Sequence, residues 1–93
     1  MNMKTYSSFV CVMTKKNENA ERTFSGFHFR DSEILSVEKL NGGNPSVWEI
    51  NIISDSTSPL AEFKKNLLSK VDAFCTKNKM SIYDADVMEE GGF

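Results

Sequence analysis

The stretch that decides the fold runs from residue 58 to residue 79 and reads SPLAEFKKNLLSKVDAFCTKNK. Ser58 is a preferred N-cap residue, and Pro59 suits the first helical position. Lys77 and Lys79 complement the negative end of a helix dipole. We expect about 20 residues of amphipathic helix, because the apolar residues fall within about 140° of a helical wheel. These residues are Leu60, Phe63, Leu67, Leu68, Val71, Phe74 and Cys75.

The segments around this helix have the composition and alternation of β-strands. Residues 5–13 (TYSSFVCVM) are apolar on both faces at their centre, which is typical of a central strand, and residues 81–88 (SIYDADVM) alternate. Residues 21–30 (ERTFSGFHFR) predict a second strand. A bulge at Gly26 would place Phe24, Phe27 and Phe29 on one face, and without it Phe24 lies on the other face. Residues 33–40 and 46–54 flank a loop with two glycines and therefore predict a hairpin. For residues 33–40 the alternative is one or two helical turns.

These elements predict an α+β fold with two layers. An antiparallel sheet of four to five strands has one long helix, about 58–79, packed on one face, in the order strand-strand-strand-strand-helix-strand. Residues 1–93 form a single small domain in this interpretation, and residues 89–93 form a frayed tail.

The predicted sheet is wider than its cover. A helix about 10 Å wide covers two or three strands that lie about 4.8 Å apart. Tyr6, Phe24 and Trp48 are then surplus aromatic residues that need a second covering surface. Because a 93-residue chain buries a modest share of its surface, we expect a homodimer or an obligate partner.

Composition gives the broad class of protein. Apolar residues make up 40% and charged residues 26% of the chain, which are ordinary globular values. The sequence contains no apolar run of about 18–20 residues, as a membrane span requires, and its N-terminus lacks the pattern of a secretory signal. Cys11 and Cys75 are too far apart in the sequence to match a known metal-binding or redox motif, and we expect both to be buried free thiols. We therefore expect a cytoplasmic protein without a membrane partner.

The net charge of −2 is unevenly distributed. Residues 1–30 carry +3, residues 31–62 carry −5, residues 63–79 carry +4 and residues 80–93 carry −4. A protein that binds nucleic acid through its phosphates usually has a basic excess. Its absence here disfavours direct nucleic-acid binding.

The residues suited to catalysis are sparse. His28 is the sole histidine, and with Cys11 and Cys75 it has no zinc-ligand spacing. Asp84 and Asp86 share one strand face near Glu89 and Glu90, an arrangement that can hold Mg²⁺ but is more typical of a solvated or protein-binding edge. We expect no enzyme, no metal and no cofactor.

Residues 48–88 resemble the C-terminal half of the ribonuclease E inhibitor family of type B. A strand, a long amphipathic helix and a strand with Tyr83-Asp84 carry this resemblance. The Gly-Trp that follows Tyr-Asp in that family is Ala85-Asp86 here, and the N-terminal half does not match. The resemblance implies a non-catalytic protein that inhibits an RNA-processing enzyme by contact.

These observations favour a small interaction or regulatory protein that binds a larger protein and inhibits or modulates it, for example an inhibitor of a host enzyme that a phage or mobile element encodes. The first alternative is an acidic DNA mimic that blocks a nuclease or restriction enzyme. The second is RNA or single-strand binding through strand aromatics and helix lysines. The predicted contact residues are Tyr6, Phe24, Trp48, Asp84, Asp86, Glu89 and Glu90.

Overall fold

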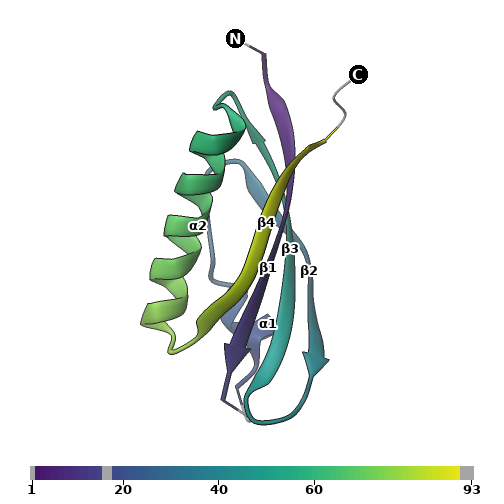
Figure 1. Cartoon of the computed structure of the whole chain (residues 1–93), viewed down its shortest axis with the longest axis vertical. Helices are drawn as coiled ribbons and strands as arrows, with labels where there is room; N and C mark the ends of the chain where they lie inside the picture. Colours follow the sequence, from purple (N-terminus) through teal and green to yellow (C-terminus); the bar gives the residue numbers. More distant parts are fainter. Residues whose placement is uncertain (1, 16–17, 91–93) are drawn as a thin grey trace.

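A computed structural model describes residues 2–15 and 18–90 (Figure 1). The predicted α+β fold is confirmed, with a four-stranded antiparallel sheet and one 18-residue helix packed against it. The elements in chain order are β1 (Lys4–Thr14), α1 (Ala20–Phe24), β2 (Ser32–Asn41), β3 (Ser46–Ser56), α2 (Leu60–Lys77) and β4 (Ser81–Glu90).

The four strands have the order β2-β3-β1-β4, and every neighbouring pair is antiparallel. With the element order β-α-β-β-α-β, this is the split βαβ or ferredoxin-like connectivity. The first helix is reduced to five residues. The predicted hairpin is the pair β2 and β3, and the open choice for residues 33–40 is settled in favour of a strand.

Helix α2 is shorter at both ends than predicted. Pro59 rather than Ser58 is the N-cap, and the Ser58 N–H donates to the Ser56 Oγ instead. At the other end Lys79 has a φ of 60°, and the Met80 N–H donates to the Cys75 carbonyl over 2.8 Å. This is a Schellman ending, which closes the helix before Lys79.

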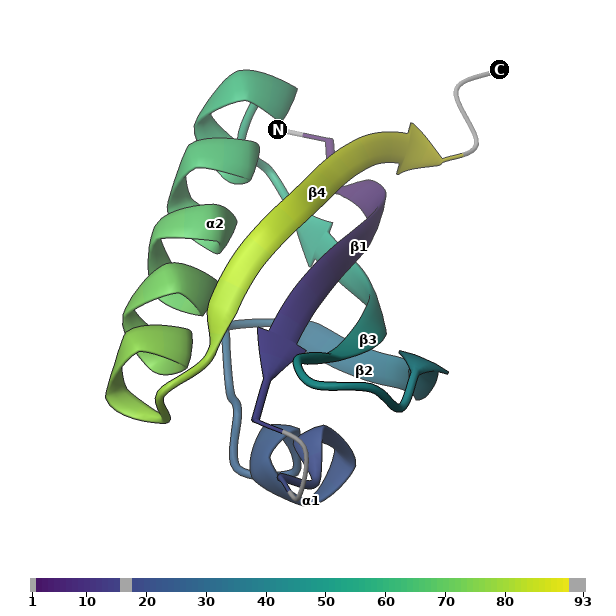
Figure 2. The same cartoon turned by 60° about the horizontal axis from the view of Figure 1, so that its bottom comes forward.

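The main correction concerns residues 21–30, which do not form a strand. Asn19 caps the short helix α1 by accepting a hydrogen bond from the Arg22 N–H. An irregular segment follows and leads to β2. It buries Phe27 and Phe29, whose rings pack against Phe74 and Phe63 of α2 at centroid distances of 5.3 and 6.1 Å. The α1 segment therefore supplies the second cover for the inner face of the sheet (Figure 2).

The core lies between that inner face and the two helical segments. Alternate residues of the central strands point into it, and α2 contributes Phe63, Leu67, Val71 and Cys75. The Tyr6 and Phe63 rings stack with centroids 4.4 Å apart. The second sheet face, to the right in Figure 1, has no helix over it in the described part of the chain.

Two residues of the predicted tail belong to the last strand. Glu89 and Glu90 belong to β4 and lie opposite Tyr6 and Thr5 of β1. Pairing with the central strand therefore orders two of the residues expected to fray. Residues 91–93 lie outside the described part of the chain.

Candidate protein-binding face

The three aromatic residues predicted as contacts lie in the core. Tyr6, Phe24 and Trp48 are 0, 1 and 7% exposed. The Tyr6 hydroxyl donates to the Ser58 carbonyl, and the Trp48 ring lies under the Lys39 ammonium at 5.1 Å from its centroid. Tyr6 stacks on Phe63 of α2, and Phe24 belongs to the α1 segment that packs on the core. None of the three rings is therefore exposed to a partner in this structure.

The predicted acidic residues are all exposed on the edge strand β4. Asp86 pairs with Lys64 of α2 at 3.3 Å, and Glu89 pairs with Lys4 at 3.6 Å. The Val87 N–H and Lys64 lower the pKa of Asp86. Asp84 and Glu90 make no ion pair with any residue that the structure describes. The four acids therefore do not form a single cluster.

Strand register shows which residues point away from the helix layer. Residues that are directly opposite in an antiparallel pair share one face, and alternate residues along a strand share it as well. The buried even-numbered residues of β1 and β3 define the inner face. We call the other side the open sheet face. Its residues on the central strands are Thr5, Ser7, Phe9, Cys11, Met13, Val47, Glu49, Asn51, Ile53 and Asp55, and their partners on the edge strands include Glu33, Ser36, Glu38, Asp84, Asp86, Met88 and Glu90.

Apolar groups on this face are only partly covered. Phe9, Met13, Val47 and Ile53 are half-buried by their strand neighbours. Met88, opposite Ser7 on β4, is 60% exposed. Together these side chains place apolar surface between the polar ones on a broad sheet face.

Edge-strand irregularities add more apolar surface. Leu35 and Leu40 lie in the two bulges of β2 and are 59 and 52% exposed. Tyr83 lies in the bulge of β4 beside Cys11 and is 53% exposed. Bulges at sheet edges redirect side chains and limit further strand pairing.

Acidic groups on the open sheet face form a row across the strands. Glu38 lies opposite Glu49, Glu49 lies opposite Cys11, and Cys11 lies opposite Asp84. We call Glu38, Glu49 and Asp84 the acidic row. Burial and then the Glu49 and Asp84 carboxylates raise the pKa of the Cys11 thiol. The Asn51 amide donates to the Glu49 carboxylate over 3.1 Å.

No basic residue of the four strands balances this row. The strands contain two lysines, Lys4 and Lys39, and both lie at inner-face positions, opposite Ser56 and Trp48. Four exposed lysines lie instead on or just after α2, on the opposite side of the molecule: Lys65, Lys70, Lys77 and Lys79. The two layers therefore carry opposite charge.

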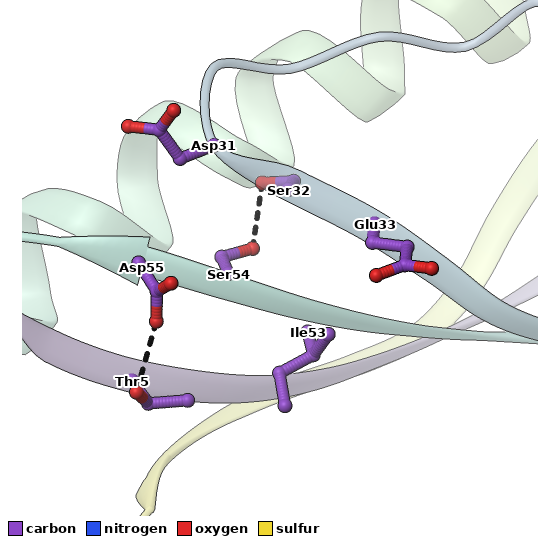
Figure 3. Close-up of a pocket in the computed structure, with 7 residues that line it drawn as sticks. All are labelled: Thr5, Asp31, Ser32, Glu33, Ile53, Ser54 and Asp55. Atoms are coloured by element: carbon purple, nitrogen blue, oxygen red, sulfur yellow. Dashed lines mark hydrogen bonds between the residues drawn. The ribbon is translucent and has the colours of Figure 1, made fainter.

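A hollow lies at one end of the sheet, where β1, β3 and the start of β2 meet (Figure 3). Its carboxylates, Asp31, Glu33 and Asp55, lie apart, and Asp55 accepts a hydrogen bond from the Thr5 hydroxyl over 2.9 Å. The described residues contain no group of three His, Cys, Asp or Glu placed to hold a metal ion. The hollow is thus an acidic surface feature.

The sole histidine and the two cysteines are not brought together as metal ligands in the described ranges. His28 is exposed between the buried Phe27 and Phe29. Cys11 and Cys75 are buried free thiols, and burial raises the pKa of both. The helix lysines, which a nucleic-acid surface would combine with strand aromatics, lie in the other layer from the two strand aromatics with exposed surface, Phe9 and Tyr83.

No protein-family model, curated protein or solved structure matches the chain. Within residues 2–15 and 18–90, none of the helices has the length and apolar character needed to cross a bilayer. Functional conclusions consequently rest on the geometry of the open sheet face.

Proposed function

We propose that the chain is a small non-enzymatic protein that binds a larger protein through its open sheet face and thereby inhibits or modulates it. The uncovered sheet face carries this proposal. Strands of 10 and 11 residues give a face about 35 Å long and about 20 Å wide. That area approaches the roughly 800 Å² that each partner contributes to a standard interface.

The mixture of side chains supports the same function. Interfaces of non-obligate complexes combine apolar and polar groups, and exposed apolar patches on small proteins mark contact sites. Phe9, Val47 and Ile53 lie on the central strands, and Met88 lies towards one edge. A partner could thus bury the apolar centre of the face without unfolding any part of this chain.

The two buried free thiols suit a reducing compartment, and we propose a cytoplasmic location. Direct RNA or single-strand binding has less support, because stacking on bases needs exposed aromatic rings beside basic groups. On the open sheet face the charged groups are carboxylates, which repel phosphate.

Affinity capture from the native host tests this function. The wild-type chain is compared with the double variant Tyr83→Ser/Met88→Ser on the open side of β4, and with Leu60→Ser, an exposed apolar residue of α2, as the control. We expect one dominant protein that the wild type and the control retain and the double variant loses. Equal capture by all three chains, or no specific protein, would refute docking through this face.

A further inference from the structure

We infer that the open sheet face binds a lysine- and arginine-rich surface of a partner protein, with apolar side chains between the cations. This inference rests on the proposed function and adds the chemistry of the partner. It follows from the distribution of charge on the four strands. Glu38, Glu49 and Asp84 have no strand lysine or arginine beside them, whereas Asp86 on the same face pairs with Lys64 of α2.

The three carboxylates of the acidic row are close enough to interact electrostatically. Neighbouring strands lie about 4.8 Å apart, so Glu38 and Glu49 are direct neighbours and Asp84 lies two strands beyond Glu49. These distances are within or near the Debye length of about 8 Å at physiological ionic strength. The three carboxylates therefore act on one another and on an incoming charge together.

Rows of different chemistry follow one another along the strands. Val47 and Met13 form the next row towards the β2–β3 turn. Phe9 lies in the next row in the opposite direction. Successive rows on one face are about 6.7 Å apart, because two residues separate them. A partner that places a cation over the acidic row can therefore place apolar groups on the rows at both sides.

The like-charge pair Glu38–Glu49 opposes the pairing of β2 with β3. Two carboxylates directly opposite on paired strands destabilise a sheet. Neither charge is paired with a strand cation, since Glu38 is exposed on an edge strand and the half-buried Glu49 accepts its hydrogen bond from the neutral Asn51 amide. Conflicts of this kind are expected at functional sites, where binding rather than folding determines the residue.

A second copy of the chain is a poor occupant of the same face. A two-fold interface places the same patch on both sides, so the carboxylates of two acidic rows would be brought into one desolvated region. Like charges brought together at an interface cost several kcal/mol. A basic partner surface removes this repulsion, and we therefore favour it over a homodimer through the open sheet face.

An NMR titration tests the charge preference. The ¹⁵N-labelled chain is titrated with an 18-residue amphipathic peptide of leucine and lysine, and separately with its leucine–glutamate counterpart. We expect the cationic peptide to shift amides of the open sheet face, with a Kd that rises at least tenfold between 50 and 500 mM NaCl. The anionic peptide should cause no such shifts.

Matched variants complete the experiment. Glu38→Gln/Glu49→Gln should weaken binding of the cationic peptide at least fivefold, whereas Glu18→Gln/Glu21→Gln, with the same change in charge outside the sheet, should not. Equal binding of both peptides on this face would overturn the charge preference and leave docking there intact. Shifts confined to α2, or self-association through the open sheet face at 50 mM NaCl, would also overturn the inference.

Discussion

Replacing Glu38 with lysine should stabilise the chain, because it converts a like-charge cross-strand pair into an opposite-charge pair. Glu38 and Glu49 are direct partners in the β2–β3 register. Opposite charges in such a pair contribute roughly 0.2–1 kcal/mol, and like charges destabilise the sheet. Removing the repulsion and adding the attraction should together raise the free energy of unfolding by about 0.5–1.5 kcal/mol. For a domain of this size that corresponds to a Tm rise of roughly 3–10 °C.

Urea unfolding, followed by the fluorescence of the single buried Trp48, measures this change. The control is Glu38→Lys in a Glu49→Gln background, where the cross-strand partner carries no charge. At 1 M salt the Debye length of about 3 Å is shorter than the strand spacing, so most of the gain should disappear. A gain no larger in the wild-type chain than in the Glu49→Gln background, or one that persists at 1 M salt, would refute the electrostatic reasoning.

Three further substitutions test the core and the buried thiol. Leu67→Ala, at a fully buried position of α2, should lower the free energy of unfolding by about 2–5 kcal/mol in urea titrations, and a loss below 1 kcal/mol would contradict the packing. Tyr6→Phe removes the donor to the Ser58 carbonyl and should cost about 1–2 kcal/mol in the same assay, with an unchanged core if the near-ultraviolet circular dichroism is preserved. Burial, with a smaller effect of Asp72, raises the pKa of the Cys75 thiol from 9.0 to about 11. Between pH 9 and pH 11 the unfolded thiol ionises while the folded one does not, so wild-type stability should fall by about 2–3 kcal/mol relative to Cys75→Ala, and parallel pH curves would contradict it.

The long helix and the hairpin could be predicted because their signals are local and redundant. In α2 the apolar spacing persists over five turns, so the error was confined to the ends. The start was misplaced by one residue because Ser58 and Pro59 both suit a helix N-terminus, and the structure uses Pro59 as the cap. The hairpin follows from the glycines between two apolar runs.

The segment 21–30 was misread because two signals competed. Phe27 and Phe29 alternate with polar residues as they would in a strand, yet Asn19 is a helix cap placed directly before Ala20. The cap was the correct signal for α1. The burial of both rings depends on their contacts with α2, which no local pattern reveals.

The strand predicted for residues 21–30 also affected which residues were predicted to contact a partner. If residues 21–30 form a strand, Tyr6, Phe24 and Trp48 exceed what one helix can cover, and the prediction therefore places them on the docking surface. The acidic strand β4 was recognised from charge alone. Glu38 and Glu49 were missed because their pairing depends on the register of β2 and β3, which the two bulges of β2 shift.

The arrangement of charge in layers explains why the net charge of −2 is a poor guide to this surface. The segment with a net charge of +4 forms most of α2 and its end, whereas most acidic residues of 31–62 and 80–90 lie on strands. Opposite faces of one small molecule then carry opposite potential, and such a molecule orients in the field of a charged partner before contact. Salt should consequently slow association more than it speeds dissociation. An acidic row that weakens the sheet while it directs this encounter also predicts a trade-off, in which Glu38→Lys gives a more stable chain that a basic partner binds more slowly.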